Sequence, residues 1–139
     1  MSNTVFVTRR EHFNAAHKLW NPKWDAETNA KVFGKCANPN WHGHNYTLFV
    51  TVKGEPDADT GYCIDLKFLS DLIEERVLSL LDHKNLNIDV DFLQGKLTSA
   101  ENVAIAIWHR LADAVKNEQR ELYCVKLYET ENNIVEYFG

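Results

Sequence analysis

The sequence predicts a single α+β domain, in which a four-stranded antiparallel sheet carries two helices packed on one of its faces. Two strand-like segments, residues 4–17 and 42–53, open the chain, and two more, residues 122–129 and 134–138, close it. Consecutive strands pair readily with each other, which favours antiparallel pairing at both ends. Two amphipathic helical segments lie between the strand pairs, and packing both on one face of the sheet buries their apolar sides.

Alternating apolar side chains identify the first two strands. The first begins with Val5 and Val7 and ends with Phe13, Ala15 and His17. The second presents one largely apolar face, formed by alternate residues: His44, Tyr46, Leu48, Val50 and Val52. The roughly 24 residues between the two strands are too many for a tight turn, and loops of that length are commonly functional.

Two segments have the periodicity of helices. The first spans residues 65–81 and has Asp65 as its expected N-cap. Its apolar side should comprise Leu66, Leu69, Leu72, Ile73, Val77, Leu80 and Leu81. The second spans residues 99–116, and Thr98 with Glu101 forms a capping-box pattern at its start. Its buried stripe should comprise Val103, Ile107, Leu111 and Val115.

Length and composition suit one soluble globular domain over residues 1–139, of which 45% are hydrophobic. The first residues lack the continuous apolar stretch of a signal peptide, and no run is long enough to cross a bilayer. We therefore expect a cytoplasmic protein without a membrane partner. Cys36, Cys63 and Cys124 are an odd number without a CxxC pair, which favours free thiols over a disulfide framework.

The net charge of -5 is unfavourable for a nucleic-acid partner, because binding to a phosphate backbone usually needs a broad basic face. A small anionic substrate needs only a local cluster of positive charge. Candidate cations for such a cluster are Arg9, Arg10, Lys18 and Lys35. The alternative for each of them is an ordinary solvated surface charge.

Three histidines indicate a metal site. Alternate residues of a strand share a face, so His42 and His44 point the same way while Gly43 points away. His17 ends the first strand and could supply a third ligand from beside them. Three neutral ligands leave the fourth position of zinc open, which is the pattern of catalytic rather than structural zinc sites.

Other ionisable residues have simpler explanations by themselves. His12 and His109 have no partner at ligand spacing, so we expect each to be a surface or hydrogen-bonded residue rather than a ligand. Asp82 and His83 adjoin where the first helix should end, where a cation is favourable without any catalytic role. A carboxylate beside an imidazole can also fix its tautomer. Glu129 follows a strand, where an exposed glutamate is the plain interpretation.

Five stretches together resemble the 6-pyruvoyltetrahydropterin synthase family, which also includes bacterial 6-carboxy-tetrahydropterin synthases. They are FNAAH (13–17), FGKCANPNWHGHNY (33–46), LDHKNLN (81–87), TSAENVA (98–104) and YETENNIVEY (128–137). The stretches span nearly the whole chain. The resemblance is specific, because the cysteine, the His-Gly-His triplet, the Asp-His pair and the late glutamate occur in the family's order.

The resemblance implies a role for each of these residues. It assigns zinc to His17, His42 and His44, the catalytic base to Cys36, proton transfer to Asp82 and His83, and the pterin anchor to Glu129. It also makes Ser99 and Glu101 candidate pterin contacts. Ala100 stands between these two where some relatives carry a hydroxyl residue, so a pure capping role for Glu101 stays open.

The implied reaction converts 7,8-dihydroneopterin triphosphate to 6-pyruvoyltetrahydropterin with loss of triphosphate. Zinc would act as a Lewis acid, Cys36 as a thiolate base, and no nicotinamide or flavin would be needed. The five residues between Cys36 and His42 favour the pyruvoyl-forming enzymes, since carboxy-forming enzymes of deazapurine (queuosine) synthesis commonly have a shorter gap. A non-catalytic zinc or pterin-binding module is the other alternative.

The family's tunnelling fold implies an assembly as well. In that fold three subunits close their sheets into a barrel and two trimers stack into a homohexamer. By this resemblance Cys36 and zinc would belong to one subunit, and Asp82 with His83 to its neighbour. The active sites would then lie between subunits.

Overall fold

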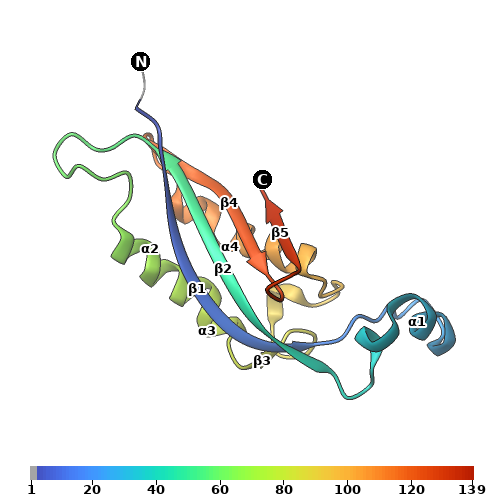
Figure 1. Ribbon diagram of the computed structural model, residues 1–139. Helices are drawn as coiled ribbons and strands as arrows, with labels where there is room; N and C mark the ends of the chain where they lie inside the picture. The colour runs from blue at the N-terminus through green and yellow to red at the C-terminus, as the bar shows by residue number, and fades with distance from the viewer. Residues whose placement is uncertain (1–2) are drawn as a thin grey trace.

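The computed structural model of the protein describes residues 3–139, and its helices α2, α3 and α4 cover one face of a five-stranded sheet (Figure 1). The strand order is β3-β1-β2-β4-β5, and every neighbouring pair is antiparallel except β3 with β1. The strands are β1 Val5–His17, β2 His42–Gly54, β3 Lys84–Asn85, β4 Arg120–Tyr128 and β5 Ile134–Tyr137. The predicted class and its four antiparallel strands are confirmed, and β3 is a short parallel addition at the edge.

Strands β1 and β2 form the long, curved centre of the molecule (Figure 1). They pair without interruption from Val5 opposite Gly54 to His17 opposite His42. Directly opposite residues of an antiparallel pair lie on the same face of the sheet. In this register the residues that alternate towards the core in β1 lie opposite those that do so in β2. The same register brings the histidines together at one end of the pair.

The helices follow the predicted order with one interruption. The first predicted helix is one continuous segment in three parts, and the second is a single helix. Their bounds are α2 Leu66–Ile73, a π-helical turn Glu74–Leu78, α3 Ser79–Leu81 and α4 Ala100–Val115. Asp65 caps α2 as predicted, because its carboxylate accepts the Lys67 N–H at 2.9 Å. None of the helices within residues 3–139 combines the length and apolar character that crossing a membrane requires.

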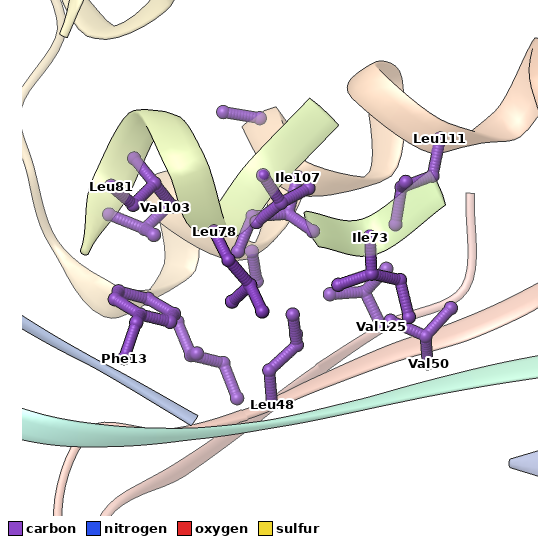
Figure 2. Packing of buried hydrophobic residues seen from close by; sticks show 14 of the residues in the cluster. Phe13, Leu48, Val50, Ile73, Leu78, Leu81, Val103, Ile107, Leu111 and Val125 are labelled. Atoms are coloured by element: carbon purple, nitrogen blue, oxygen red, sulfur yellow. The ribbon is translucent and has the colours of Figure 1, made fainter. Parts of the chain in front are cut away.

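The hydrophobic core lies between the sheet and these helices. Figure 2 shows side chains of both layers meeting there. Leu48 and Val50 of β2 point towards Ile73, Ile107 and Leu111 of the helices, and all five are fully buried. The predicted stripe of α4 is confirmed, since each of its four residues is fully buried: Val103, Ile107, Leu111 and Val115.

The π-helical turn alters the buried side of the first helix. A π turn takes more residues than an α turn, so the residues after Ile73 are rotated relative to a regular helix. Leu78 is consequently buried, whereas Leu80 is 38% exposed. Leu66 is 46% exposed in the first turn, among other exposed residues. The prediction that Leu66 and Leu80 share the buried side is therefore wrong.

The segment predicted as a loop contains a helix, α1 (Ala26–Phe33), and a 3₁₀ turn (Gly34–Ala37). In Figure 1 this segment projects as an arm from the end of β1 and β2. Polar contacts hold the helix. Asp25 caps it by accepting the Thr28 N–H at 2.7 Å, and the buried Asn29 amide donates to the Asn21 carbonyl at 3.0 Å. Because α1 has no broad apolar stripe, hydrophobic periodicity could not reveal it.

The start of α4 differs from the predicted capping box by one residue. Ser99 is the N-cap, and its hydroxyl accepts the Asn102 N–H at 3.3 Å. Thr98 is fully buried and hydrogen-bonds elsewhere, and Glu101 is exposed in the first turn. The capping-box prediction for Thr98 and Glu101 is therefore wrong, because a buried Thr98 hydroxyl has nearer acceptors outside the helix.

Candidate active site

The end of the β1–β2 pair brings three imidazole rings into contact. His17 lies opposite His42, and His44 is two residues further along the same face of β2. The ring centroids are 4.5 Å apart for His17 and His42, 4.9 Å for His42 and His44, and 5.1 Å for His17 and His44. One ligand nitrogen from each ring lies within 4.8 Å of the other two, so the group could hold a metal ion.

Each of the three rings has a buried nitrogen without a hydrogen-bond partner. These atoms are His17 Nε2, His42 Nδ1 and His44 Nε2. Buried polar atoms in native proteins are almost always paired, so three orphaned nitrogens on one site need a common partner. A cation that accepts three nitrogen lone pairs satisfies all of them, and the residues present therefore fit a metal ion.

The electrostatics of the group favour the metal-binding form. Burial lowers the pKa of His17 to about 4, and burial with the neighbouring His44 lowers the pKa of His42. The Nδ1 atom of His17 is 2.7 Å from the carbonyl oxygen of Thr98. A carbonyl only accepts, so Nδ1 carries the hydrogen and Nε2 presents its lone pair to the site.

Glu129 lies beside the histidines at the end of β4. Its two carboxylate oxygens are each 3.9 Å from a histidine nitrogen, Oε2 from His17 Nε2 and Oε1 from His44 Nε2. Its backbone N–H donates to the Asn133 carbonyl at 3.0 Å, which closes the turn after the strand. The carboxylate also borders a hollow of about 380 Å³. Glu129 therefore lies against the histidine group rather than alone at the surface.

Tyr46 lies beside the histidine group, although the sequence pattern predicts only a residue on the largely apolar face of the second strand. The side chain is fully buried, and its hydroxyl has no hydrogen-bond partner. Its ring lies 5.6 Å from His44 and 6.3 Å from His17, centroid to centroid. Burial and the nearby Glu129 carboxylate both raise the pKa of this phenol. The sequence signal for this position is that Tyr46 follows His44 by two residues and therefore lies on the same face of β2.

Asp82 and His83 are in contact directly after α3. The Asp82 Oδ2 atom is 3.0 Å from His83 Nδ1, and Oδ1 accepts the Asn14 N–H at 2.9 Å. That hydrogen bond and the adjacent His83 lower the pKa of Asp82. The His83 backbone has a φ of 61°, and its N–H donates to the Asn14 carbonyl at 2.6 Å. The pair is thus held against β1, while the imidazole is exposed.

His83 and His44 border the same hollow, whose volume is about 560 Å³. Residues of β1 and β3 supply much of the remaining lining: Asn14, Ala15, Ala16, Lys84 and Asn85. A small molecule in this hollow would therefore lie along the edge of β1, between His83 and the end of the sheet that carries His44.

Cys36 lies on the 3₁₀ turn that follows α1, and its side chain is half-buried. Its carbonyl accepts the Leu19 N–H at 2.7 Å, two residues after His17. The backbone thus ties Cys36 to the end of β1. Of the described residues lining the two hollows above, none is Cys36. The chain is seen to bring together the histidines and Glu129, and separately Asp82 and His83.

The remaining predicted residues are the two candidate pterin contacts, Ser99 and Glu101, and the four candidate cations. Ser99 caps α4 next to Thr98, whose carbonyl lies 2.7 Å from His17 Nδ1, whereas Glu101 is exposed in the first turn of α4. Among the candidate cations, Arg9 pairs with Glu11 at 2.8 Å. The Lys18 ammonium lies 4.4 Å from the centre of the Trp41 ring, a cation–π contact next in sequence to His17 and His42. Arg10 and Lys35 are exposed, as are His12 and His109, as predicted.

Comparison with known proteins identifies the family. The family model described as 6-pyruvoyl tetrahydropterin synthase matches residues 6–139 of the chain. The chain is 45% identical over 139 residues to 6-pyruvoyl tetrahydrobiopterin synthase of Dictyostelium discoideum, covering 100% of this chain and 99% of that protein. It is 47% identical over 133 residues to the Homo sapiens protein of the same name, covering 96% of this chain and 90% of that protein.

A solved structure agrees in fold. The structure of Caenorhabditis elegans 6-pyruvoyl tetrahydropterin synthase superimposes with a TM-score of 0.89 and 36% sequence identity, covering 99% of this chain and 97% of that one. Together with the match of the family model, this shows that the chain belongs to the 6-pyruvoyl tetrahydropterin synthase family.

Proposed function

We propose that the protein is a zinc-dependent lyase that converts 7,8-dihydroneopterin triphosphate to 6-pyruvoyltetrahydropterin and releases triphosphate. Membership of the synthase family supports the reaction, at 45% identity over the full length of one named synthase. The proposal of a metal ion rests on three buried histidine nitrogens that lack hydrogen-bond partners and lie within 4.8 Å of one another.

His17, His42 and His44 would hold the zinc. Three neutral nitrogen ligands leave a coordination position for substrate, as in catalytic zinc sites. When bound, zinc supplies Lewis-acid polarisation of the hydroxyl groups on the pterin side chain. The Thr98 carbonyl keeps His17 in the tautomer that presents Nε2.

Cys36 would remove the proton from the side-chain carbon of the substrate. A thiol is an effective base only as a thiolate, and nearby positive charge favours that form. The 3₁₀ turn of Cys36 is bonded to the end of β1 next to His17, which supports a place beside the metal.

The Asp82–His83 pair would move the second proton. Asp82 accepts from His83 Nδ1 at 3.0 Å, and this leaves Nε2 free to exchange a proton with the substrate. Asp82 is itself held by the Asn14 N–H, so the imidazole has one preferred orientation. The wide hollow that His83 borders supports access of a small molecule to this ring.

Glu129 would anchor the pterin ring. The amino-pyrimidine edge of a pterin offers two neighbouring N–H donors, which suits a carboxylate with two acceptor oxygens. Because Glu129 stands 3.9 Å from His17 and His44, a ring bound there would place its side chain near the metal ligands. Ser99 is a secondary candidate contact, whereas the exposed Glu101 has less support.

The active enzyme would be a homohexamer of two stacked trimers, with sites between subunits. Two observations support a completing subunit: His83 borders a hollow that Cys36 does not border, and Phe6 and Phe138 are more than half exposed. The net charge of -5 is unfavourable for nucleic acid. Cys36, Cys63 and Cys124 are free thiols, which supports a reducing compartment, the cytoplasm.

Product analysis tests this proposal. The zinc-loaded protein is incubated with 7,8-dihydroneopterin triphosphate, and the pterin product is identified by mass spectrometry with and without a reductant that traps the unstable pyruvoyl compound. A 6-pyruvoyl product supports the proposal. A 6-carboxy product would assign the chain to the deazapurine branch, and absence of turnover would leave a zinc- or pterin-binding module.

A further inference from the structure

We propose that Asn87 is a positioning residue that holds the metal ligand His17 in its binding orientation and joins it to the loop of His83. Asn87 lies four residues after His83 and is half-buried against the end of β1. The inference rests on the proposed function, in that His17 is taken as a metal ligand. Asn87 itself touches neither the histidine ring nor the hollow beside His83.

The side-chain amide of Asn87 imitates a neighbouring strand. Its Oδ1 accepts the Lys18 N–H at 3.1 Å, and its Nδ2 donates to the Lys18 carbonyl at 3.1 Å. Both backbone groups of the residue after His17 are therefore bonded to one side chain. These bonds extend the short β1–β3 pairing, in which Leu86 N–H donates to the Ala16 carbonyl at 2.8 Å.

The same amide also holds the residue that sets the tautomer of His17. The Thr98 hydroxyl donates to Asn87 Oδ1 at 3.0 Å, and the Thr98 carbonyl is 2.7 Å from His17 Nδ1. Thr98 is fully buried. Asn87 thus fixes His17 from two sides, through the peptide that follows it and through the carbonyl that its ring contacts.

The loop containing Asn87 is anchored to β1 and to Lys18, the residue that follows β1. At one end, Asn14 bonds to both Asp82 and His83. At the other end, Asn87 bonds to Lys18. His17 lies between these anchor points on β1. Removing the Asn87 amide would release the end next to His17 and leave the bonds of Asp82 and His83 to Asn14 in place.

Zinc affinity of the intact protein tests this role, measured by competition with a chromophoric chelator. We expect Asn87→Ala to weaken zinc binding by about 10- to 100-fold, the usual effect of losing a group that orients a metal ligand. Asn87→Asp keeps an acceptor for the Lys18 N–H and the Thr98 hydroxyl but replaces the Nδ2 donor with a carboxylate oxygen that faces the Lys18 carbonyl, so it should also weaken zinc binding.

Gln94→Ala is the matched control. The Gln94 amide bonds only to carbonyls of the same loop, at 3.2 to 3.4 Å from Val90, Ile88 and Asn87. It should bind zinc like the wild type. If Asn87→Ala also binds zinc like the wild type, or if Gln94→Ala loses as much affinity, the inference is overturned.

A second variant covers the case in which Asn87→Ala does not fold. Thr98→Val keeps the carbonyl that contacts His17 but removes the hydroxyl, which bonds to Asn87 Oδ1 at 3.0 Å and lies 3.3 Å from the Lys18 carbonyl, and it should weaken zinc binding as well. Unchanged affinity in Thr98→Val would then count against the inference. Because the readout is metal affinity, a wild-type protein that binds zinc without forming product would overturn the proposed function and leave the role of Asn87 standing.

Discussion

The histidine group and the Asp82–His83 pair lie near each other but are built differently. The side chain of His17 is 1% exposed, whereas those of His83 and Asp82 are 77% and 41% exposed. Strand register places the histidines, and a loop after a helix places the pair. Burial lowers the pKa of His17 and so favours its neutral, metal-binding form, while the His83 imidazole is open to the surroundings.

Because the two groups are built differently, the two halves of the proposed mechanism should fail separately. Loss of a buried ligand should remove the metal, and loss of an exposed proton-transfer group should spare it. The four predictions below test this separation.

The largest expected effect is that of His42→Ala. Two histidines would remain, so zinc should be lost on dialysis, and turnover should fall by about 10³-fold or more, because a metal contributes several kcal/mol to such chemistry. Metal content by plasma emission spectrometry and product formation measure the two effects. His109→Ala, an exposed histidine on α4, is the control. Unchanged metal content in His42→Ala would refute the ligand assignment.

Cys36→Ala should separate chemistry from metal binding. Removing a general base costs about 10² to 10⁴ in rate, so turnover should fall to that extent while zinc content stays at one ion per chain. The buried thiol Cys63, changed to Ala, serves as a matched control for the loss of a sulfhydryl. Full activity in Cys36→Ala would exclude this thiol from the mechanism.

Asp82→Asn should have a smaller effect on the rate. The amide carbonyl can still accept the Asn14 N–H, but its NH₂ group would then face His83 Nδ1 and favour the other tautomer. We expect kcat to fall by roughly 10²-fold, with KM and zinc content near their wild-type values. Steady-state kinetics with a metal assay measure this. A loss of zinc in this variant would contradict the separation of the two regions.

The smallest expected effect is that of removing zinc by chelation on the stability of the fold. The core between sheet and helices does not include the three histidines, so the metal-free protein should keep its secondary structure and unfold cooperatively. Zinc present at about 100 times its Kd should add only about 2.7 kcal/mol. Circular dichroism and thermal melts with and without a chelator measure this. Collapse of the fold on chelation would indicate a structural zinc role instead.

Local patterns were sufficient for most of the fold. Alternation in β1 and β2 and the stripe of α4 come from side-chain burial, which the order of apolar residues records directly. Helix α1 was missed because its stability comes from the Asp25 cap and the buried Asn29 amide rather than from an apolar stripe. The exposed Leu80 was missed because a π turn changes the phase of a helix without a sequence signal.

The sequence alone was sufficient to predict the candidate metal-ligand residue types, the shared face of His42 and His44, and the adjacency of Asp82 and His83. The three-dimensional fold was needed to place His17 opposite His42, since register depends on the pairing of whole strands. It also decided that the Thr98 carbonyl, 81 residues away, contacts the His17 ring. Backbone groups are the same in every residue, so contacts made by a carbonyl become visible only when the chain is folded.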